Sequence, residues 1–193
     1  YTIGLQGRDH VNKAFHDADL VITVGYDLVE YGPKSWNADR NKKIVHIDFL
    51  PAEIDQHYPV DVDVAADLAD ALWQINEELN RRHIDLLPFF DIGQWAGLRQ
   101  TIADDLAAEK DDDSFPMKPQ RILNDVRAFL GASDILLSDV GAHKMWIARY
   151  YQCEDPNTCL ISNGFCTMGF AMPGAIGAKM AHPEKRVLSI NGD

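Results

Sequence analysis

The fold class of this chain is decided by the stretch Ile135-Leu136-Leu137-Ser138-Asp139-Val140-Gly141-Ala142-His143. Its first four residues form a short apolar run, which predicts a buried strand over 135–138. Gly141 then marks a turn, and a helix is predicted from His143 to Tyr151. A strand, a turn and a helix in this order form the repeating unit of a parallel α/β sheet.

The same alternation continues on both sides of this stretch. On its C-terminal side the sequence predicts a strand over 158–161, a helix over 173–180 and a strand over 187–190. On its N-terminal side it predicts a helix from Pro119 to Leu130, with Gly131 as the C-cap. Such an alternation builds a parallel sheet whose ligands gather at the carboxyl ends of the strands.

An earlier α/β series lies in residues 1–83. Apolar, β-branched runs predict buried strands over 20–24 and 44–47, and alternating valines predict an edge strand over 60–64. Asp67 is placed to cap a helix whose apolar stripe ends near Arg82. We interpret this part as the later portion of an open sheet without its opening strands.

The predicted fold class is therefore α/β, with two open, mostly parallel sheets flanked by helices, both incomplete in this chain. We predict one domain over 1–83, a linker with a helix over 84–117, and a second domain over 118–193. The acidic run Asp111-Asp112-Asp113 is interpreted as a solvated connector, because neighbouring carboxylates repel one another. Since the chain lacks an initiator Met and stops directly after a predicted strand, we expect an excerpt of a longer polypeptide.

The composition is that of a folded protein. The 193 residues are 46% hydrophobic, and 18 Lys and Arg against 30 Asp and Glu give a net charge of −12. Affinity for nucleic acid depends on Lys and Arg that displace counterions, and this acidic chain has no basic stripe. We therefore exclude nucleic acid and anionic membrane as partners.

The negative charge is unevenly distributed along the chain. Residues 134–193 hold five basic and six acidic side chains, so nearly all of the excess falls on 1–133. No apolar run approaches the ~18–20 residues that cross a bilayer, and the first residues show no signal pattern. We predict a cytoplasmic protein.

Three cysteines, Cys153, Cys159 and Cys166, are spaced by six and seven residues. This spacing matches neither a disulfide framework nor a zinc site. We expect buried, reduced thiols. Four further residues are expected in the core by default: Met145, Trp146, Met168 and Met172.

Three strand-to-helix turns of the second part are candidates for a ligand site. They cover 139–143, 162–169 and 192–193. Gly141 lets the backbone approach a ligand, and the helix that follows offers unpaired N–H groups to an anion. Together the three turns outline one cleft for a phosphate and an apolar group.

Two other features of the sequence suggest different functions. Asp48 follows a strand, as does the acidic residue that binds a nucleotide ribose, yet no G-x-G-x-x-G precedes it. Nucleotide binding by the first part stays open as an alternative. Ser162 lacks the G-x-S-x-G pattern and a placed His–Asp pair, which disfavours a serine hydrolase.

The three turns carry a resemblance to a known family. In order and spacing, residues 139–150, 161–178 and 191–193 resemble the thiamine-diphosphate-binding domain of acetolactate synthases. Upstream, residues 18–37 and 44–48 are similar to the middle domain, especially of the catabolic, FAD-independent branch.

The resemblance implies a set of cofactor contacts. Gly192 and Asp193 match the start of the family's Gly-Asp-Gly motif, in which the Asp binds the Mg²⁺ that anchors the diphosphate. The remaining implied contacts are Gly141, Ala142 and His143 against the diphosphate, and Cys166 and Met168 beside the aminopyrimidine. Met168 would be the apolar wedge that bends the cofactor, and a main-chain carbonyl near Cys166 would accept from its amine.

The resemblance also implies a reaction, in which two pyruvates condense to 2-acetolactate with loss of carbon dioxide on thiamine diphosphate. The family's activating Glu belongs to an N-terminal domain outside this chain, so we predict no catalytic residue here and an inactive fragment. Family active sites form between subunits, which implies a homodimer or homotetramer, and FAD is not expected. The alternatives are another 2-oxo-acid decarboxylase or carboligase of the superfamily, or a non-catalytic nucleotide-binding or structural module.

Overall fold

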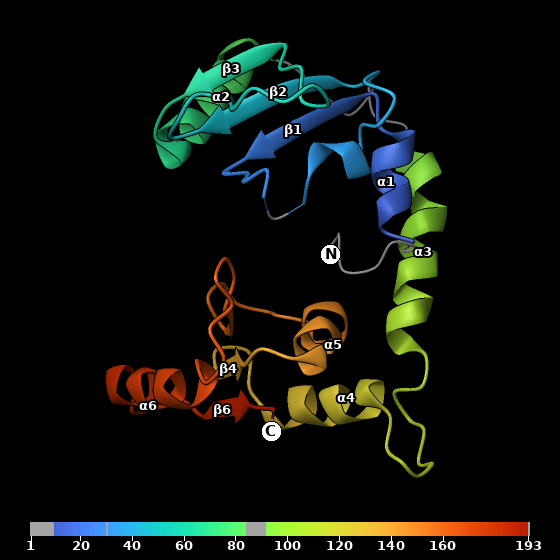
Figure 1. Cartoon of the computed structure of the whole chain (residues 1–193), viewed down its shortest axis with the longest axis vertical. Coiled ribbons are helices and arrows are strands. Elements are labelled where there is room, and N and C mark those ends of the chain that lie inside the picture. The colour runs from blue at the N-terminus through green and yellow to red at the C-terminus, as the bar shows by residue number, and fades with distance from the viewer. Residues whose placement is uncertain (1–9, 30, 84–91, 193) are drawn as a thin grey trace. The chain divides into compact units, whose positions relative to one another are not determined.

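The computed structural model describes residues 10–29, 31–83 and 92–192. The chain divides between Thr101 and Ile102 into two compact units, and each contains a three-stranded parallel sheet (Figure 1). The predicted α/β class with two open parallel sheets is confirmed. The predicted domain limits at 83 and 118 stay a prediction.

The first unit is built on the sheet β1-β2-β3. Its elements are α1 (Asn12–Asp17), β1 (Leu20–Val24), a short 3-10 helix (Pro33–Ser35), β2 (Lys43–Asp48), β3 (Val62–Ala65) and α2 (Leu68–Arg81). Asp67 caps α2 as predicted, because its carboxylate accepts a hydrogen bond of 3.0 Å from the Asp70 N–H. The predicted edge strand is present as β3.

One face of this first sheet has a closed aromatic core. Val21 of β1 lies opposite Ile44 of β2, and both pack with Trp36 and Tyr58. The other face is covered only in part: Leu20, Ile22 and Val24 of β1 are 46%, 58% and 43% exposed. The apolar stripe of α2 is likewise half-buried, since Leu72 and Ile75 remain about 40% exposed.

The second unit is built on the sheet β5-β4-β6. Its elements are α4 (Pro119–Phe129), β4 (Ile135–Ser138), α5 (Ala142–Tyr150), β5 (Cys159–Ile161), α6 (Ala171–Ala181) and β6 (Val187–Ile190). A further helix, α3 (Ile92–Ala107), crosses the division between the units.

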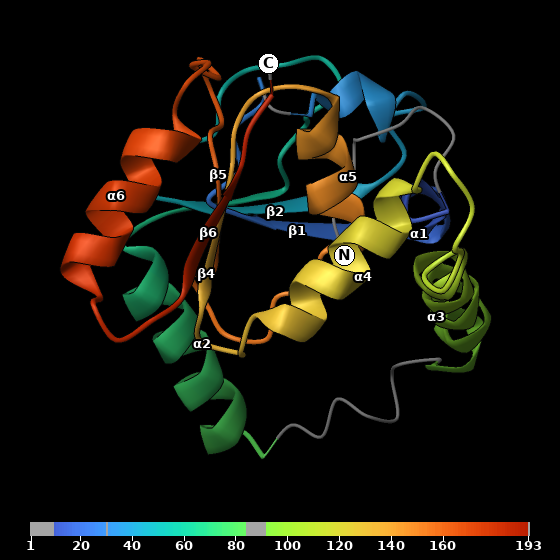
Figure 2. The ribbon, with the colours of Figure 1, turned by 90° about the horizontal axis from the view of Figure 1, so that it is seen from below.

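The central strand β4 organises the second unit. All four of its residues are buried. Leu136 packs with Leu123 of α4 and Ile147 of α5, whereas Ile135 and Leu137 pack with α6 on the opposite face. Figure 2 shows this arrangement, with α6 on one side of the sheet and α4 and α5 on the other.

The predicted C-cap at Gly131 is wrong. Helix α4 ends at Phe129, and its C-cap residue Leu130 has extended backbone. The Arg127 guanidinium donates to the carbonyls of Leu130 and Gly131 at 2.7 and 2.5 Å, and the Asp134 carboxylate accepts from the Gly131 N–H at 2.7 Å. Because these side chains satisfy the helix end, no left-handed glycine is needed there.

Two burial predictions are also corrected. The three cysteines are free thiols, but Cys153 is exposed and the other two are half-buried. The residues expected in the core by default lie at the surface, and their exposed fractions are 44% for Met145, 41% for Trp146, 71% for Met168 and 58% for Met172. Their positions lie on outward faces of α5 and α6 or in the loop before α6, which the apolar character of a residue alone does not reveal.

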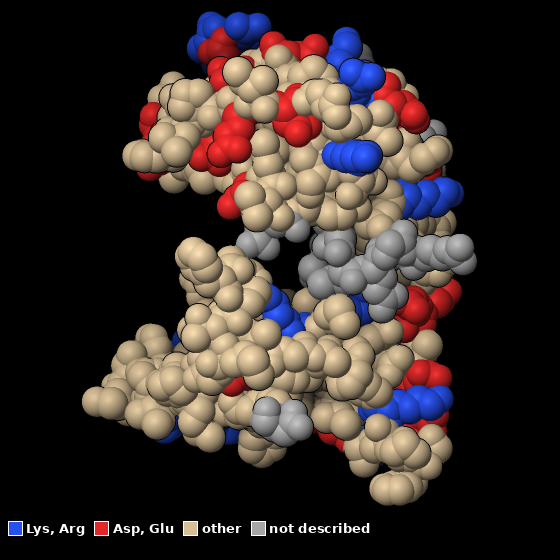
Figure 3. Space-filling model, viewed as in Figure 1, with Lys and Arg blue, Asp and Glu red and all other residues tan. Residues whose placement is uncertain are grey.

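Charge differs between the two units. On the face shown in Figure 3, acidic side chains are frequent over the unit that contains β1 to β3 and sparse over the sheet and helices of the second unit. This distribution agrees with the near balance of five basic and six acidic side chains in residues 134–193. Within the described part of the chain, no helix combines the length and the hydropathy needed to cross a membrane.

Candidate functional site

The loops that follow β4, β5 and β6 leave the same edge of the second sheet, because the three strands are parallel. The Asp139 N–H donates to the Ile190 carbonyl at 2.9 Å and so joins the ends of β4 and β6. A Cβ on Gly192 would lie 3.4 Å from Cε1 of His143 and 3.8 Å from the Val140 carbonyl oxygen. The end of the described chain therefore lies against the turn after β4.

Asp139 links the turn after β4 to the loop before α6. Its side chain is 6% exposed, and Oδ1 accepts from the N–H groups of Val140 at 2.7 Å and Gly169 at 2.9 Å. The Val140 N–H is the main cause that holds the pKa of Asp139 below its ordinary value, with Gly169, Ala171 and Phe170 contributing, against burial, which raises it. A buried negative charge thus fixes two loops to each other.

Lys144 supplies a second link between these loops. Its Nζ donates to the Ser162 carbonyl at 2.6 Å and to the Cys166 sulfur at 3.1 Å. Cys166 itself has a φ of +47°, which non-glycine residues rarely adopt. The first turns of α5 and the loop 162–169 are therefore joined by one half-buried ammonium group.

The turn at Gly141 is suited to an anion. Gly141 has a φ of +154°, and a Cβ there would lie 2.7 Å from Cε1 of His143, so any other residue would strain the turn or displace the ring. No side chain of the described residues caps the first turn of α5, and no acidic residue lies in this turn. The backbone N–H groups and the positive end of the helix dipole are therefore left for a ligand.

His143 provides a further polar atom in this turn. Its Nε2 is buried and has no hydrogen-bond partner among the residues that the structure describes. Buried polar atoms are nearly always paired, so an unpaired one needs an explanation. A bound polar group would provide the partner, and this observation fits a diphosphate at the start of α5.

The predicted site residues are brought together as follows. Gly141, Ala142, His143 and Gly192 lie around the start of α5, and Cys166 is connected to α5 through Lys144. Met168 lies in the same loop as Cys166, with its side chain 71% exposed. Asp193 lies outside the described residues.

The sequence places Asp139 in the candidate turn 139–143 without giving it a contact, and Lys144 lies outside the three predicted turns. A carboxylate directly after a strand as apolar as β4 must find partners once buried, and this signal was available for Asp139. Lys144 gave no local signal, because the carbonyl it binds belongs to Ser162, 18 residues away.

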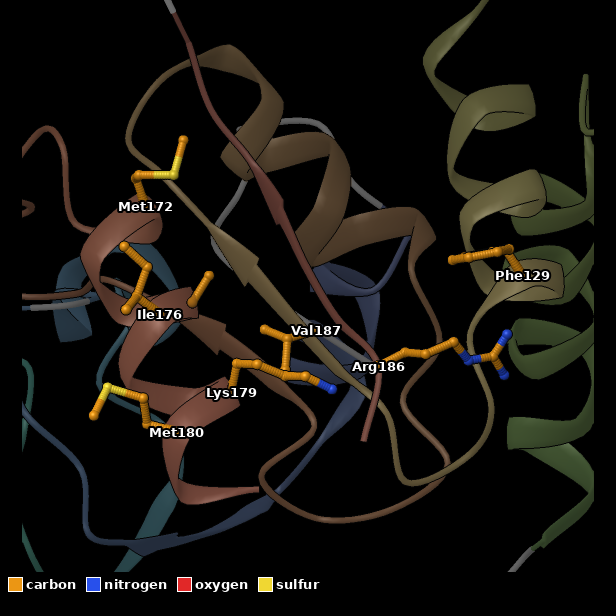
Figure 4. A pocket seen from close by; sticks show the side chains of 8 residues that line it. Phe129, Met172, Ile176, Lys179, Met180, Arg186 and Val187 are labelled. Carbon is orange, nitrogen blue, oxygen red and sulfur yellow. The ribbon is translucent and has the colours of Figure 1, made fainter. Parts of the chain in front are cut away.

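A groove of about 620 Å³ lies elsewhere on the second unit, beside α6 and the amino end of β6 (Figure 4). Met172, Ile176 and Met180 of α6 line it together with Val187. It contains none of the predicted site residues and is largely apolar. We therefore do not assign the candidate site to this groove.

Comparison with known families matches both units. A model described as "Thiamine pyrophosphate enzyme, central domain" matches residues 1–75. A model described as "Thiamine pyrophosphate enzyme, C-terminal TPP binding domain" matches residues 139–193, which include the three loops described above. Residues 1–75 and 139–193 thus match two domains of thiamine pyrophosphate enzymes. Thiamine pyrophosphate is the same compound as thiamine diphosphate, so the cofactor expected from the sequence is the one that names this family.

Several acetolactate synthases resemble the chain over almost its whole length. It is 32% identical, over 99% of its residues, to the acetolactate synthase of Bacillus subtilis, the probable acetolactate synthase large subunit of Methanococcus aeolicus and the catabolic acetolactate synthase of Raoultella terrigena. It covers 33%, 34% and 34% of these three proteins. The chain therefore spans about a third of the length of the curated relatives it matches, and the predicted resemblance is confirmed.

Proposed function

We propose that this chain is part of a thiamine-diphosphate-dependent acetolactate synthase, which joins two pyruvate molecules to 2-acetolactate with loss of carbon dioxide. The proposal rests on one observation: Asp139 and Lys144 tie the turn after β4 to the loop before α6 in the segment that matches the cofactor-binding domain. The acetolactate synthases among its relatives support the choice of reaction.

The start of α5 would hold the diphosphate. The backbone N–H groups of Ala142 and His143 lie at the positive end of the helix dipole. They would donate to a negatively charged ligand. His143 Nε2 would take the buried hydrogen bond that it lacks among the described residues. Gly192 leaves the space beside His143 open, and Asp193, by the resemblance, would bind Mg²⁺ with a hard carboxylate oxygen.

The loop 162–169 would hold the aminopyrimidine. Met168 presents an apolar side chain that is 71% exposed in this structure and would be covered by the ring. Asp139 holds Gly169, the next residue along the chain, through its N–H at 2.9 Å, and so positions Met168. When bound, thiamine diphosphate supplies the nucleophilic carbon and the electron sink for decarboxylation.

The remaining parts of the proposed enzyme lie outside the described residues. We propose that the activating Glu is supplied by an N-terminal domain, that the full protein is a cytoplasmic homodimer or homotetramer, and that it belongs to the FAD-independent branch. A flavin absorbance spectrum in the purified full protein would contradict the last of these proposals. The domain limits at 83 and 118 are part of the same proposal.

The full natural polypeptide should convert pyruvate to acetolactate in the presence of thiamine diphosphate and Mg²⁺. Asp193→Ala should abolish this activity and the Mg²⁺ dependence of cofactor binding, whereas Asp111→Ala, which removes an exposed carboxylate of the acidic connector, should leave both intact. Undiminished activity in Asp193→Ala would refute the metal assignment. Turnover of a different 2-oxo acid without acetolactate would favour another carboligase or decarboxylase of the family.

A further inference from the structure

Side chains of other segments hold the loop between β5 and α6 at three points. Lys144 Nζ donates to the Ser162 carbonyl at 2.6 Å and to the Cys166 sulfur at 3.1 Å. Asp139 Oδ1 accepts from the Gly169 N–H at 2.9 Å. Lys144 therefore fixes the start and the middle of this loop, whereas Asp139 fixes its end.

Met168 lies between the fixed middle and the fixed end of the loop. It follows Cys166 by two residues and directly precedes Gly169, and its side chain is 71% exposed. The direction of such an exposed side chain is set by the backbone on both sides of it. Asp139 fixes the backbone on one side of Met168, and Lys144 fixes it on the other.

The backbone at Cys166 needs a partner to hold its conformation. Its φ of +47° lies in the left-handed region, which is unfavourable for a residue with a Cβ and persists only where the surroundings impose it. The Cys166 sulfur accepts from Lys144 Nζ and donates to the Ser162 carbonyl at 3.6 Å. These three groups form a closed set of hydrogen bonds that holds the loop in this conformation.

The position of Lys144 in α5 is unfavourable for the helix itself. The helix begins at Ala142, so Lys144 lies in its first turn, where the positive end of the helix dipole repels a cation. Helix stability therefore does not account for a lysine at this position. Two acceptors on the neighbouring loop do, because they receive two of the three N–H donors of the ammonium group.

We propose that Lys144 is a positioning residue for the aminopyrimidine half of the cofactor, and that it acts through the loop and not by contact with the diphosphate. This inference rests on the proposed function, in which the loop that carries Met168 binds the aminopyrimidine. Loss of the ammonium group should release the loop at Ser162 and Cys166, so that Met168 no longer keeps its direction. The N–H groups at the start of α5 should stay in place.

The affinities of the full natural polypeptide for two ligands test this role. Thiamine diphosphate would contact both halves of the proposed site, whereas inorganic diphosphate would contact only the start of α5. With Mg²⁺ present, Lys144→Met should weaken the binding of thiamine diphosphate about tenfold, as expected for a lost charge-assisted hydrogen bond. The affinity for inorganic diphosphate should change by less than about twofold. Isothermal titration calorimetry measures both affinities.

Two further variants complete the binding experiment. Lys144→Arg retains a positive charge and N–H donors, so it should restore much of the affinity for thiamine diphosphate. Lys179→Met is the matched control, because it removes a lysine of α6 whose Nζ donates to the carbonyls of Pro183 and Lys185 at 2.8 and 2.7 Å. It should leave both affinities unchanged.

Hydrogen exchange of the cofactor-free full polypeptide tests the anchor without any ligand. Peptides from residues 162–169 should exchange faster in Lys144→Met than in the natural sequence, because the loop loses two hydrogen bonds. Peptides from β6 should exchange at the same rate in both proteins. Circular dichroism checks the fold of each variant. If Lys144→Met does not fold, Lys144→Gln takes its place in both measurements.

Two results in a folded variant would overturn the role of Lys144 alone. One is unchanged exchange of residues 162–169, and the other is an equal change, including none, in the affinities for thiamine diphosphate and inorganic diphosphate. A natural sequence that does not bind thiamine diphosphate would overturn the proposed function and the role of Lys144 together. Faster exchange, selective loss of thiamine diphosphate and rescue by Lys144→Arg support the proposal.

Discussion

Gly141 combines two properties that no other residue type supplies. Its φ of +154° is unfavourable for any residue with a Cβ, and that Cβ would lie 2.7 Å from the His143 ring. Gly141→Ala must therefore move either the turn or the ring, at a cost of about 1–3 kcal/mol. We expect a lower free energy of unfolding in urea and weaker binding of thiamine diphosphate.

Gly177→Ala is the matched control for Gly141→Ala. Apart from its chain neighbours and the backbone of α6 itself, no atom of the described residues would lie within 4 Å of a Cβ on Gly177. This substitution should be neutral or stabilise the protein by about 0.5–1 kcal/mol, because it reduces the freedom of the unfolded chain. Equal stability of the two variants would contradict the account of the turn.

Asp139 makes the stability of the second unit depend on pH. Hydrogen bonds from the Val140 N–H and its neighbours lower the pKa of the native carboxyl, so the unfolded chain takes up a proton first as the pH falls. The contribution of Asp139 to the free energy of unfolding is fully present above the ordinary carboxyl pKa of about 4. It is lost as the pH falls through the lower native pKa. The advantage of the natural sequence over Asp139→Asn should therefore shrink below pH of about 4.

Urea unfolding of both proteins between neutral and strongly acidic pH measures this effect. Asp111→Asn, at an exposed position, should follow the natural sequence throughout. A stability difference between the natural sequence and Asp139→Asn that stays constant into strong acid would show that the carboxylate charge does not hold the loops.

At the scale of elements, a buried hydrogen-bond network joins β1 and β2 to the segment before β3. The Tyr58 hydroxyl pairs with Thr23 Oγ1 at 2.6 Å and with His46 Nδ1 at 2.9 Å, and all three side chains are buried. Tyr58→Phe leaves two buried polar groups with weaker partners. We expect a loss of about 1–2 kcal/mol in the free energy of unfolding.

Tyr31→Phe is the control for this network. Its ring packs against Phe15 in the same aromatic cluster, but its hydroxyl is not a member of the network. Denaturant unfolding should show a clearly smaller loss for Tyr31→Phe than for Tyr58→Phe. Similar losses would mean that the hydroxyl of Tyr58 contributes no more than any tyrosine hydroxyl of this cluster.

The elements themselves could be predicted where a short apolar run is bounded by turn residues. The predicted strands over 135–138 and 187–190 coincide with β4 and β6. The predicted start of the last helix was less accurate, since α6 begins at Ala171 rather than Pro173. Proline is tolerated throughout the first helical turn, where N–H groups lack partners, so it does not mark the first residue.

The sequence predicts where the site lies, but not which hydrogen bonds hold its loops together. Parallel strands place the loops after β4, β5 and β6 at one edge, and the sequence pattern alone gives this result. The bonds that join those loops connect Asp139 to Gly169 and Lys144 to Ser162, across 30 and 18 residues. Such pairings depend on where the loops meet in space, and no local pattern encodes them.

At the scale of the whole molecule, each unit leaves an apolar face exposed. Ile22 of β1 is 58% exposed, and Ile176 and Met180 of α6 are 59% and 80% exposed. Contiguous apolar surface of this kind promotes association. The 193-residue chain on its own should therefore self-associate with rising concentration and bind the dye ANS.

Ile176→Lys should reduce both self-association and ANS binding, because it places a charge within the apolar face of α6. Asn80→Lys adds the same charge at an exposed position of α2 and should change them less. Static light scattering and dye fluorescence measure the difference. Equal behaviour of the two variants would show that the α6 face is not the surface through which the chain associates.

The central position of β4 links the thermal stability of the site to that of the whole second sheet. Its backbone N–H groups donate in both directions, from Ile135 to the Arg186 carbonyl and from Leu136 to the Thr158 carbonyl. Amide hydrogens of a strand that has a neighbouring strand on each side exchange with deuterium only when the sheet opens. Because the turn that carries Gly141 starts at the end of this strand, heat inactivation of cofactor binding and cooperative melting of the second unit should share one midpoint.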